Sequence, residues 1–151
     1  MVKESQQLHG LRHKDYQRYR SYCTRRVRRL RKTLHFVCGT SRRFQKKEIN
    51  IEEVNDSKFL LIPLYQAERA WAYAMQLKQE VNDGPRKRFH LANRLRKAVK
   101  HAQELEKLSQ SNKCDARTKL EAQGYLNLMS GQLFFELQKW NESLKSFEIS
   151  K

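Results

Sequence analysis

A run of basic residues with no acidic residue among them occupies the first third of this 151-residue chain. Between Tyr16 and Lys47 there is no aspartate or glutamate, and there are twelve basic side chains. They are Arg18, Arg20, Arg25, Arg26, Arg28, Arg29, Arg31, Lys32, Arg42, Arg43, Lys46 and Lys47. Like charges one turn apart on a helix repel, so such a segment folds at a cost that a bound polyanion would relieve. Arginine outnumbers lysine here, and its guanidinium binds phosphate bidentately and stacks on bases, which favours nucleic acid.

The basicity is local. The formal net charge is +16, and the run between Tyr16 and Lys47 supplies most of it. A second basic cluster lies between Asp83 and Glu104, where no acidic residue occurs. Its members are Arg86, Lys87, Arg88, Arg94, Arg96, Lys97 and Lys100. Two concentrated clusters indicate a binding surface, because charge placed only for solubility would be spread along the chain.

Apolar residues within the basic run recur every three or four positions, which is the spacing of one helix face. They are Tyr16, Tyr19, Cys23, Val27, Leu30, Leu34 and Val37. The pattern predicts an amphipathic helix of about seven turns, with its apolar seam on the body and its arginines outward. Gly39 is expected to end this helix in a left-handed cap, and residues 40–55 are expected to form a basic loop.

Four further helices follow from the pattern of apolar residues. The most apolar stretch should begin at a cap formed by Asp56 or Ser57 and extend to about residue 81. Pro63 lies near its start, either as the first helical residue or as a kink, and we favour one helix with an irregular start. After a turn at residues 82–85, Pro85 should open a third helix that extends to about residue 108.

A polar loop at residues 109–114 should precede a fourth helix, which is capped by Asp115 and extends to about Gln138. Residues 139–141 are then expected to form a short turn into a fifth helix. No stretch shows the alternation of a strand. The sequence therefore predicts an all-α protein of antiparallel helical hairpins, with a long N-terminal arginine-rich helix.

The last two predicted helices carry the spacing of a tetratricopeptide repeat, although an ordinary helical hairpin is the alternative. The residues that carry it are Gly131, Phe134, Leu137, Trp140, Ser143 and Phe147. Small residues at Gly131 and Ser143 would let two helices cross closely. A single repeat cannot bury its own face, so we expect a fragment of a longer protein with further helical pairs after Lys151.

The sequence does not predict an enzyme. It contains no glycine-rich phosphate loop, no GxSxG and no HExxH motif, and we expect no cofactor. The five histidines, His9, His13, His35, His90 and His101, lack metal-ligand spacing, and Cys23, Cys38 and Cys114 are expected to be reduced thiols. No apolar run approaches the ~20 residues that span a bilayer, and the N-terminus lacks the apolar segment of a signal peptide.

RNA is the favoured nucleic acid because no helix-turn-helix or zinc-finger pattern places a recognition helix in B-form DNA. Arginine-rich helices suit RNA, where a bulge or internal loop widens the narrow deep groove. Tyr16 and Tyr19 lie on the apolar seam and should be core residues, whereas Tyr22 and Phe44 are candidates for stacking on an unpaired base. Two alternatives stay open: a helical-repeat adaptor that binds an acidic peptide or protein, and a basic helix at a membrane surface.

Four segments closely resemble the N-terminal RNA-binding domain of the signal recognition particle 68 kDa subunit family. They are HGLRHKDYQRYRSYCTRRVRRLRKTL (9–34), AERAWAYAMQLKQE (67–80), PRKRFHLANRLRKAVKHAQELEKL (85–108) and DARTKLEAQGY (115–125). Residues 1–9 are polar and are expected to form a flexible N-terminus. The resemblance implies a tetratricopeptide-like RNA-binding domain at residues 10–151. It also implies that residues 18–32 enter the major groove of the particle's RNA near the three-way junction of the S domain, bending and remodelling it.

The second basic cluster would then support the neighbouring phosphate backbone. From this cluster the predicted RNA-binding residues are Arg86, Lys87, Arg88, Arg94 and Lys97, which join the twelve of the basic run. The resemblance further implies pairing with the 72 kDa subunit through a C-terminal region absent from this chain, and contact with other particle subunits and the ribosome. The implied setting is cytoplasmic targeting of nascent proteins to the endoplasmic reticulum, with assembly in the nucleolus.

Overall fold

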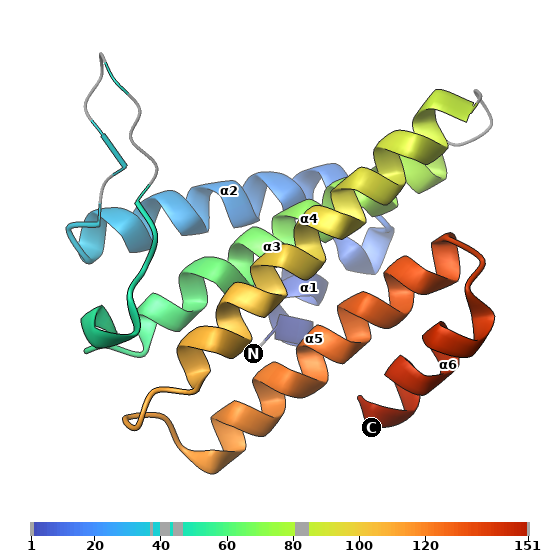
Figure 1. The fold of residues 1–151 in the computed structure, drawn as a ribbon. Coiled ribbons are helices and arrows are strands. Elements are labelled where there is room, and N and C mark those ends of the chain that lie inside the picture. Colours follow the sequence, from blue (N-terminus) through green and yellow to red (C-terminus); the bar gives the residue numbers. More distant parts are fainter. Residues whose placement is uncertain (1, 37, 40–42, 44–46, 81–84, 151) are drawn as a thin grey trace.

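The computed structural model describes residues 2–36, 38–39, 43, 47–80 and 85–150, and these residues form helices and connecting segments without a β-strand (Figure 1). The all-α prediction is therefore confirmed. The elements are α1 (Val2–Leu8), η1 (Leu11–His13), α2 (Tyr16–Thr33), η2 (Ile51–Glu53), α3 (Lys58–Gln79), α4 (Pro85–Ser109), α5 (Ala116–Glu136) and α6 (Trp140–Ile149).

Each long helix packs on the one before it, from α2 through α6 (Figure 1). Four residues of the predicted apolar seam are buried, because Tyr19, Cys23, Val27 and Leu30 of α2 pack against α3. Tyr16 and Leu34 of the seam are half-buried, and Val37 lies outside the described residues. Further along the chain, α3, α4 and α5 share a core in which alanines let the helices approach closely. These alanines are Ala70, Ala74, Ala98 and Ala102. The arginine-rich helix is thus an outer layer held on α3.

The arginine-rich helix is shorter than predicted, because it ends at Thr33 and not at Gly39. His35 takes the left-handed conformation with φ 51°, the backbone N–H of Phe36 donates to the Arg31 carbonyl at 2.9 Å, and that of His35 donates to the Lys32 carbonyl at 3.2 Å. This is a Schellman cap, with histidine at the position usually taken by glycine. The turn lets Phe36 pack on the core between α2 and α3. Gly39, also at positive φ, lies in the following segment.

The start of α3 follows the prediction of one helix with an irregular beginning. Pro63 lies inside the helix and is buried. The carboxylate of Asp56 accepts a hydrogen bond from the backbone N–H of Lys58 at 2.9 Å, whereas the Ser57 side chain makes no capping bond. As predicted, α4 begins at Pro85, while residues 82–84 of the predicted turn lie outside the described residues.

The connection between α5 and α6 comes earlier than predicted. Gln138 has φ 60° and the backbone N–H of Lys139 donates to the Phe134 carbonyl at 2.9 Å, so Trp140 already belongs to α6. The crossing itself is close: the Ser143 hydroxyl donates to the Gly131 carbonyl at 3.0 Å. A Cβ at position 131 would lie 2.8 Å from the Phe147 ring. These small residues have the role that the repeat pattern predicted.

The N-terminal residues, expected to be flexible, contain the short helix α1. The Gln6 side chain donates a hydrogen bond to the carboxylate of Glu68 at 2.9 Å, and the His9 ring stacks on Tyr22. Amphipathic periodicity does not reveal a polar helix of this length.

Candidate nucleic-acid interface

The charged face of α2 is open to solvent. Arg18, Arg25, Arg28, Arg29 and Lys32 are exposed, and Arg20, Arg26 and Arg31 are half-buried. In the part of the chain that the structure describes, none of these eight side chains forms an ion pair with a carboxylate. Their mutual repulsion is therefore not relieved within the described residues, which suits a polyanionic partner.

Two of the half-buried arginines are partly fixed by the body. The Nε–H groups of Arg26 and Arg31 are buried without a hydrogen-bond acceptor among the described residues. The Arg26 guanidinium lies 5.8 Å from the centroid of the Tyr65 ring. The exposed arginines are better probes of binding than these two, because their replacement should leave the packing of α2 intact.

The two basic clusters meet at Tyr73 of α3. The guanidinium carbon of Arg20, from α2, lies 4.4 Å from the centroid of this ring, and that of Arg94, from α4, lies 4.6 Å from it. His90 packs edge-on against the same ring at 5.3 Å and accepts a 3.1 Å hydrogen bond from Nε of Arg94. A single tyrosine thus joins basic residues from α2 and α4 into one surface.

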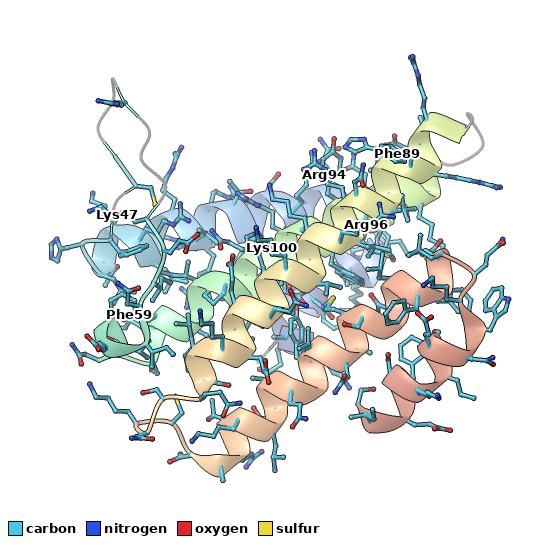
Figure 2. The ribbon with its side chains drawn as sticks, in the orientation of Figure 1. Lys47, Phe59, Phe89, Arg94, Arg96 and Lys100 are labelled. Carbon is cyan, nitrogen blue, oxygen red and sulfur yellow. The ribbon has the colours of Figure 1, made fainter. Side chains whose placement is uncertain are left out.

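The basic face of α4 extends this surface (Figure 2). Arg86 and Lys97 are exposed, as are Arg96 and Lys100, which Figure 2 labels with Arg94 along the helix. Arg88 is also exposed, but it lines a pocket with Phe135 of α5 and Trp140 of α6 and is therefore not brought into this surface. Lys87 differs from the others. Its ammonium lies 3.9 Å from the carboxylate of Glu80 and also donates to the Glu80 carbonyl at 3.2 Å. Of the predicted RNA-binding residues on α4, Lys87 is therefore the one whose charge is most neutralised by a carboxylate of the domain itself.

The loop after α2 contributes Arg43 and Lys47, which are both exposed. Figure 2 labels Lys47 at the end of this loop that leads to α3. The predicted site residues Arg42, Phe44 and Lys46 lie outside the described residues.

Tyr22, the other candidate for base stacking, already packs against aromatic rings of the domain itself. Its ring stacks on His9 with centroids 3.6 Å apart and an interplanar angle of 16°, and Tyr65 packs edge-on at 6.1 Å. A base that stacked on this ring face would have to displace His9. Tyr19 is fully buried, and Tyr16 is half-buried against Trp71.

Sequence reasoning missed Arg69, which lies in the middle of α3. It lines a cavity between α2, α3 and α4 together with Arg20, Arg94 and Lys97. Burial, followed by the neighbouring charge of Arg31, lowers the pKa of the Arg69 guanidinium below its ordinary value. The sequence contained one indication that Arg69 is unusual, because it is the single basic residue between Lys58 and Lys78, within the most apolar helix.

No group of three or more histidine, cysteine, aspartate or glutamate side chains in the described ranges is arranged to hold a metal ion. His101, at the edge of the cavity, contacts the carboxylate of Glu104 through Nδ1 at 2.9 Å. Burial lowers the pKa of His101, against the opposing effect of Glu104. The imidazole is therefore mainly neutral near pH 7.

Residues 11–151 match the protein family described as "SRP68: RNA-binding signal recognition particle 68". The chain belongs to this family. It is 52% identical over 156 residues to signal recognition particle subunit SRP68 of Drosophila melanogaster, an alignment that covers 99% of the chain and 26% of that protein. It is 44% identical over 161 residues to the Caenorhabditis elegans subunit SRP68, covering 100% of the chain and 26% of that protein. The chain thus spans about a quarter of the length of these curated relatives.

The solved structure of the SRP68-RBD from Chaetomium thermophilum has the same fold. The TM-score is 0.84 at 28% sequence identity, and the match covers 99% of this chain and 76% of that chain. The SRP68 family consists of RNA-binding subunits of a ribonucleoprotein particle and not of enzymes. Family membership therefore confirms the prediction that the chain is not an enzyme. In the described part of the chain, no helix has the length and apolar character needed to cross a bilayer.

Proposed function

We propose that this SRP68-family domain binds the RNA of the signal recognition particle through the joined basic surface of α2 and α4. The observation that carries the proposal is the exposed arginine face of α2, which has no carboxylate partner among the described residues although its apolar seam is buried. Family membership supplies the class of ligand, and the basic surface supplies the means of binding it.

In the proposed complex, residues 18–32 enter the major groove near the three-way junction of the S domain, and the RNA bends and a nearby internal loop is remodelled. An 18-residue helix is about 27 Å long, so α2 can follow a groove that a bulge has widened. Arg86, Arg94 and Lys97 of α4 would hold the backbone beside it, whereas Arg88, in a pocket with residues of α5 and α6, would contact only a strand that passes that side of α4. Phe44 remains a proposed stacking residue, and Tyr22 would act only if His9 moves away.

The wider setting is also a proposal, and it comes from the resemblance and the names of the relatives. The full-length protein would pair with the 72 kDa subunit through a region outside this chain, and would meet other particle subunits and the ribosome. Its place would be the cytoplasm, at the endoplasmic reticulum during cotranslational targeting, and the nucleolus during assembly.

The test is to replace three exposed α2 arginines, Arg25, Arg28 and Arg29, by glutamine and to measure binding of the particle's S-domain RNA. If six to ten phosphates are neutralised, wild-type affinity should fall roughly 10³–10⁵-fold between 50 and 200 mM salt. If the three arginines each contact a phosphate, the triple variant should lower the slope of log affinity against log salt by about 2 to 3. Helical circular dichroism should not change, because these side chains are exposed.

A matched control removes the same charge elsewhere. Arg117, Lys139 and Lys145 are exposed residues on and between α5 and α6, and their replacement by glutamine should leave the RNA affinity nearly unchanged. Equal losses in the two triple variants would mean that only net charge matters and would overturn the proposed surface. Binding of an acidic peptide but not of RNA would favour the adaptor alternative. Deleting residues 16–47 would not be informative, because it removes the α2 part of the core.

A further inference from the structure

The cavity between α2, α3 and α4 contains a concentration of positive charge that no carboxylate among the described residues neutralises. Its volume is about 230 Å³, and the described residues that line it include Arg20, Arg69, Arg94 and Lys97 but no carboxylate. Arg69 comes from α3, the helix that forms the floor between α2 and α4. Among the described residues, no carboxylate lies within ion-pair distance of Arg69.

Two of the three guanidinium groups in this cavity are held in place before any ligand arrives. Arg20 and Arg94 both lie against the Tyr73 ring, and Nε of Arg94 is bonded to His90. Arg69 is half-buried in α3, where the charges of Arg31 and Arg94 act on it in addition to desolvation. Holding like charges in a partly dry cavity is unfavourable unless an anion enters, and side chains fixed in advance lose little entropy when it does.

We propose that this cavity is a phosphate-binding site, and that it receives a backbone phosphate of the bound RNA between α2 and α4. The volume is below the roughly 300–1,000 Å³ of typical small-molecule sites, so it suits one phosphate group and not a whole nucleotide. Arginine, with its five N–H donors, is suited to phosphate oxygens, and three arginines meet here. The basic faces of α2 and α4 flank the cavity and would hold the neighbouring phosphates of the same strand. The inference rests on the proposed RNA-binding function and assigns Arg69 to it.

The test compares Arg69→Gln with Arg117→Gln, which removes an exposed arginine of α5. Binding of S-domain RNA is measured from 50 to 300 mM salt, and folding is checked by circular dichroism and thermal unfolding. We expect Arg69→Gln to weaken binding by about tenfold and to lower the salt slope by about 1. Arg117→Gln should match wild type. Lys97→Gln, at an exposed position in the same cavity, provides a second variant if Arg69→Gln does not fold.

A second arm separates RNA phosphate from free phosphate. Thermal unfolding of the RNA-free domain is measured with inorganic phosphate or with chloride at the same ionic strength. If phosphate stabilises wild type but not Arg69→Gln, while RNA binding is equal in both, the cavity binds a free anion and the assignment to RNA is wrong. If neither measurement separates Arg69→Gln and Lys97→Gln from wild type, there is no phosphate site. If wild type itself does not bind the RNA, the proposed function fails, and the phosphate arm still reports on the cavity.

Discussion

The hydroxyl of Tyr19 donates a 2.7 Å hydrogen bond to the carboxylate of Glu68, and both side chains are completely buried. The same carboxylate accepts hydrogen bonds from Tyr125 of α5 at 2.7 Å and from Gln6 of α1 at 2.9 Å. One acidic residue on α3 therefore connects α1, α2 and α5. Because α2 carries the arginines, this buried carboxylate fixes how the basic face is presented.

Removing the Glu68 carboxylate should destabilise the domain strongly. Glu68→Ala leaves the buried donor of Tyr19 and the partly buried donors of Gln6 and Tyr125 without this acceptor and opens a cavity, so we expect the free energy of unfolding to fall by about 3–5 kcal/mol. Glu68→Gln keeps one acceptor and should cost less, about 1–2 kcal/mol. Urea unfolding measures both. As a control, Glu121→Ala at an exposed position should stay within about 0.5 kcal/mol of wild type, and a similarly small effect of Glu68→Ala would contradict the network.

The buried phenols should make the fold sensitive to alkali. Burial, followed by the charge of Glu68, raises the pKa of Tyr19 and of Tyr125, and burial raises the pKa of Cys23 from 9.0 to about 12. A raised folded-state pKa stabilises the fold fully below the unfolded-state pKa. This stability is lost as pH rises above about 9 for the cysteine and about 10 for the tyrosines.

The free energy of unfolding, measured from pH 8 to pH 11.5, should therefore decline steeply at the upper end. Each tyrosine that stays protonated only in the folded state contributes about 1.4 kcal/mol per pH unit above pH 10. Tyr19→Phe removes one such group and should flatten the decline by that amount, despite a lower stability at pH 8. Parallel curves for the variant and wild type would show that Tyr19 does not titrate differently in the two states.

Two glycines of α5 should respond oppositely to alanine. A Cβ at Gly124 meets only a backbone oxygen at 3.8 Å, so Gly124→Ala should stabilise the helix by about 0.5–1 kcal/mol. A Cβ at Gly131 would lie 2.8 Å from the Phe147 ring, so Gly131→Ala should destabilise by about 1 kcal/mol despite the same gain in helix propensity. Thermal unfolding of both variants measures the difference. Stabilisation by both substitutions would mean that α6 is not closely packed on α5.

Tyr73 should influence RNA binding without carrying charge. Tyr73→Leu removes the ring that positions Arg20 and Arg94 before the RNA binds, and two cation–π contacts of about 0.5–1 kcal/mol each limit the resulting affinity loss to about five- to thirty-fold. The salt slope should stay as in wild type, because no cation is lost. Tyr73→Phe keeps the ring and should bind normally. A reduced salt slope in Tyr73→Leu would instead show that phosphate contacts themselves were lost.

Several elements were predictable because their signals are local in the chain. The apolar seam of α2 repeats with helical spacing, Pro85 opens α4, and Gly131 and Ser143 meet where the repeat pattern predicted. The end of α2 was not predictable in this way. The Schellman turn at His35 depends on where Phe36 packs in the folded core, and Gly39 was the stronger local signal.

At the interface, too, some residues were predictable from local sequence and others depended on tertiary packing. The exposed arginines of α2 follow from charge and periodicity, whereas Tyr22 looked available because its contact with His9 depends on the fold of the N-terminus. Arg69 was overlooked because a lone arginine in an apolar helix gives no sign of which helices lie beside it.

The sequence alone determined an all-α chain with an arginine-rich helix, and it predicted a partner of opposite charge, because helical periodicity and charge density are properties of neighbouring residues. Only the tertiary structure decided that Arg20 and Arg94 meet over Tyr73, that Arg69 joins them, and that Glu68 holds α2 on the body. Those contacts join residues far apart in the chain, and their geometry exists only once the helices have packed.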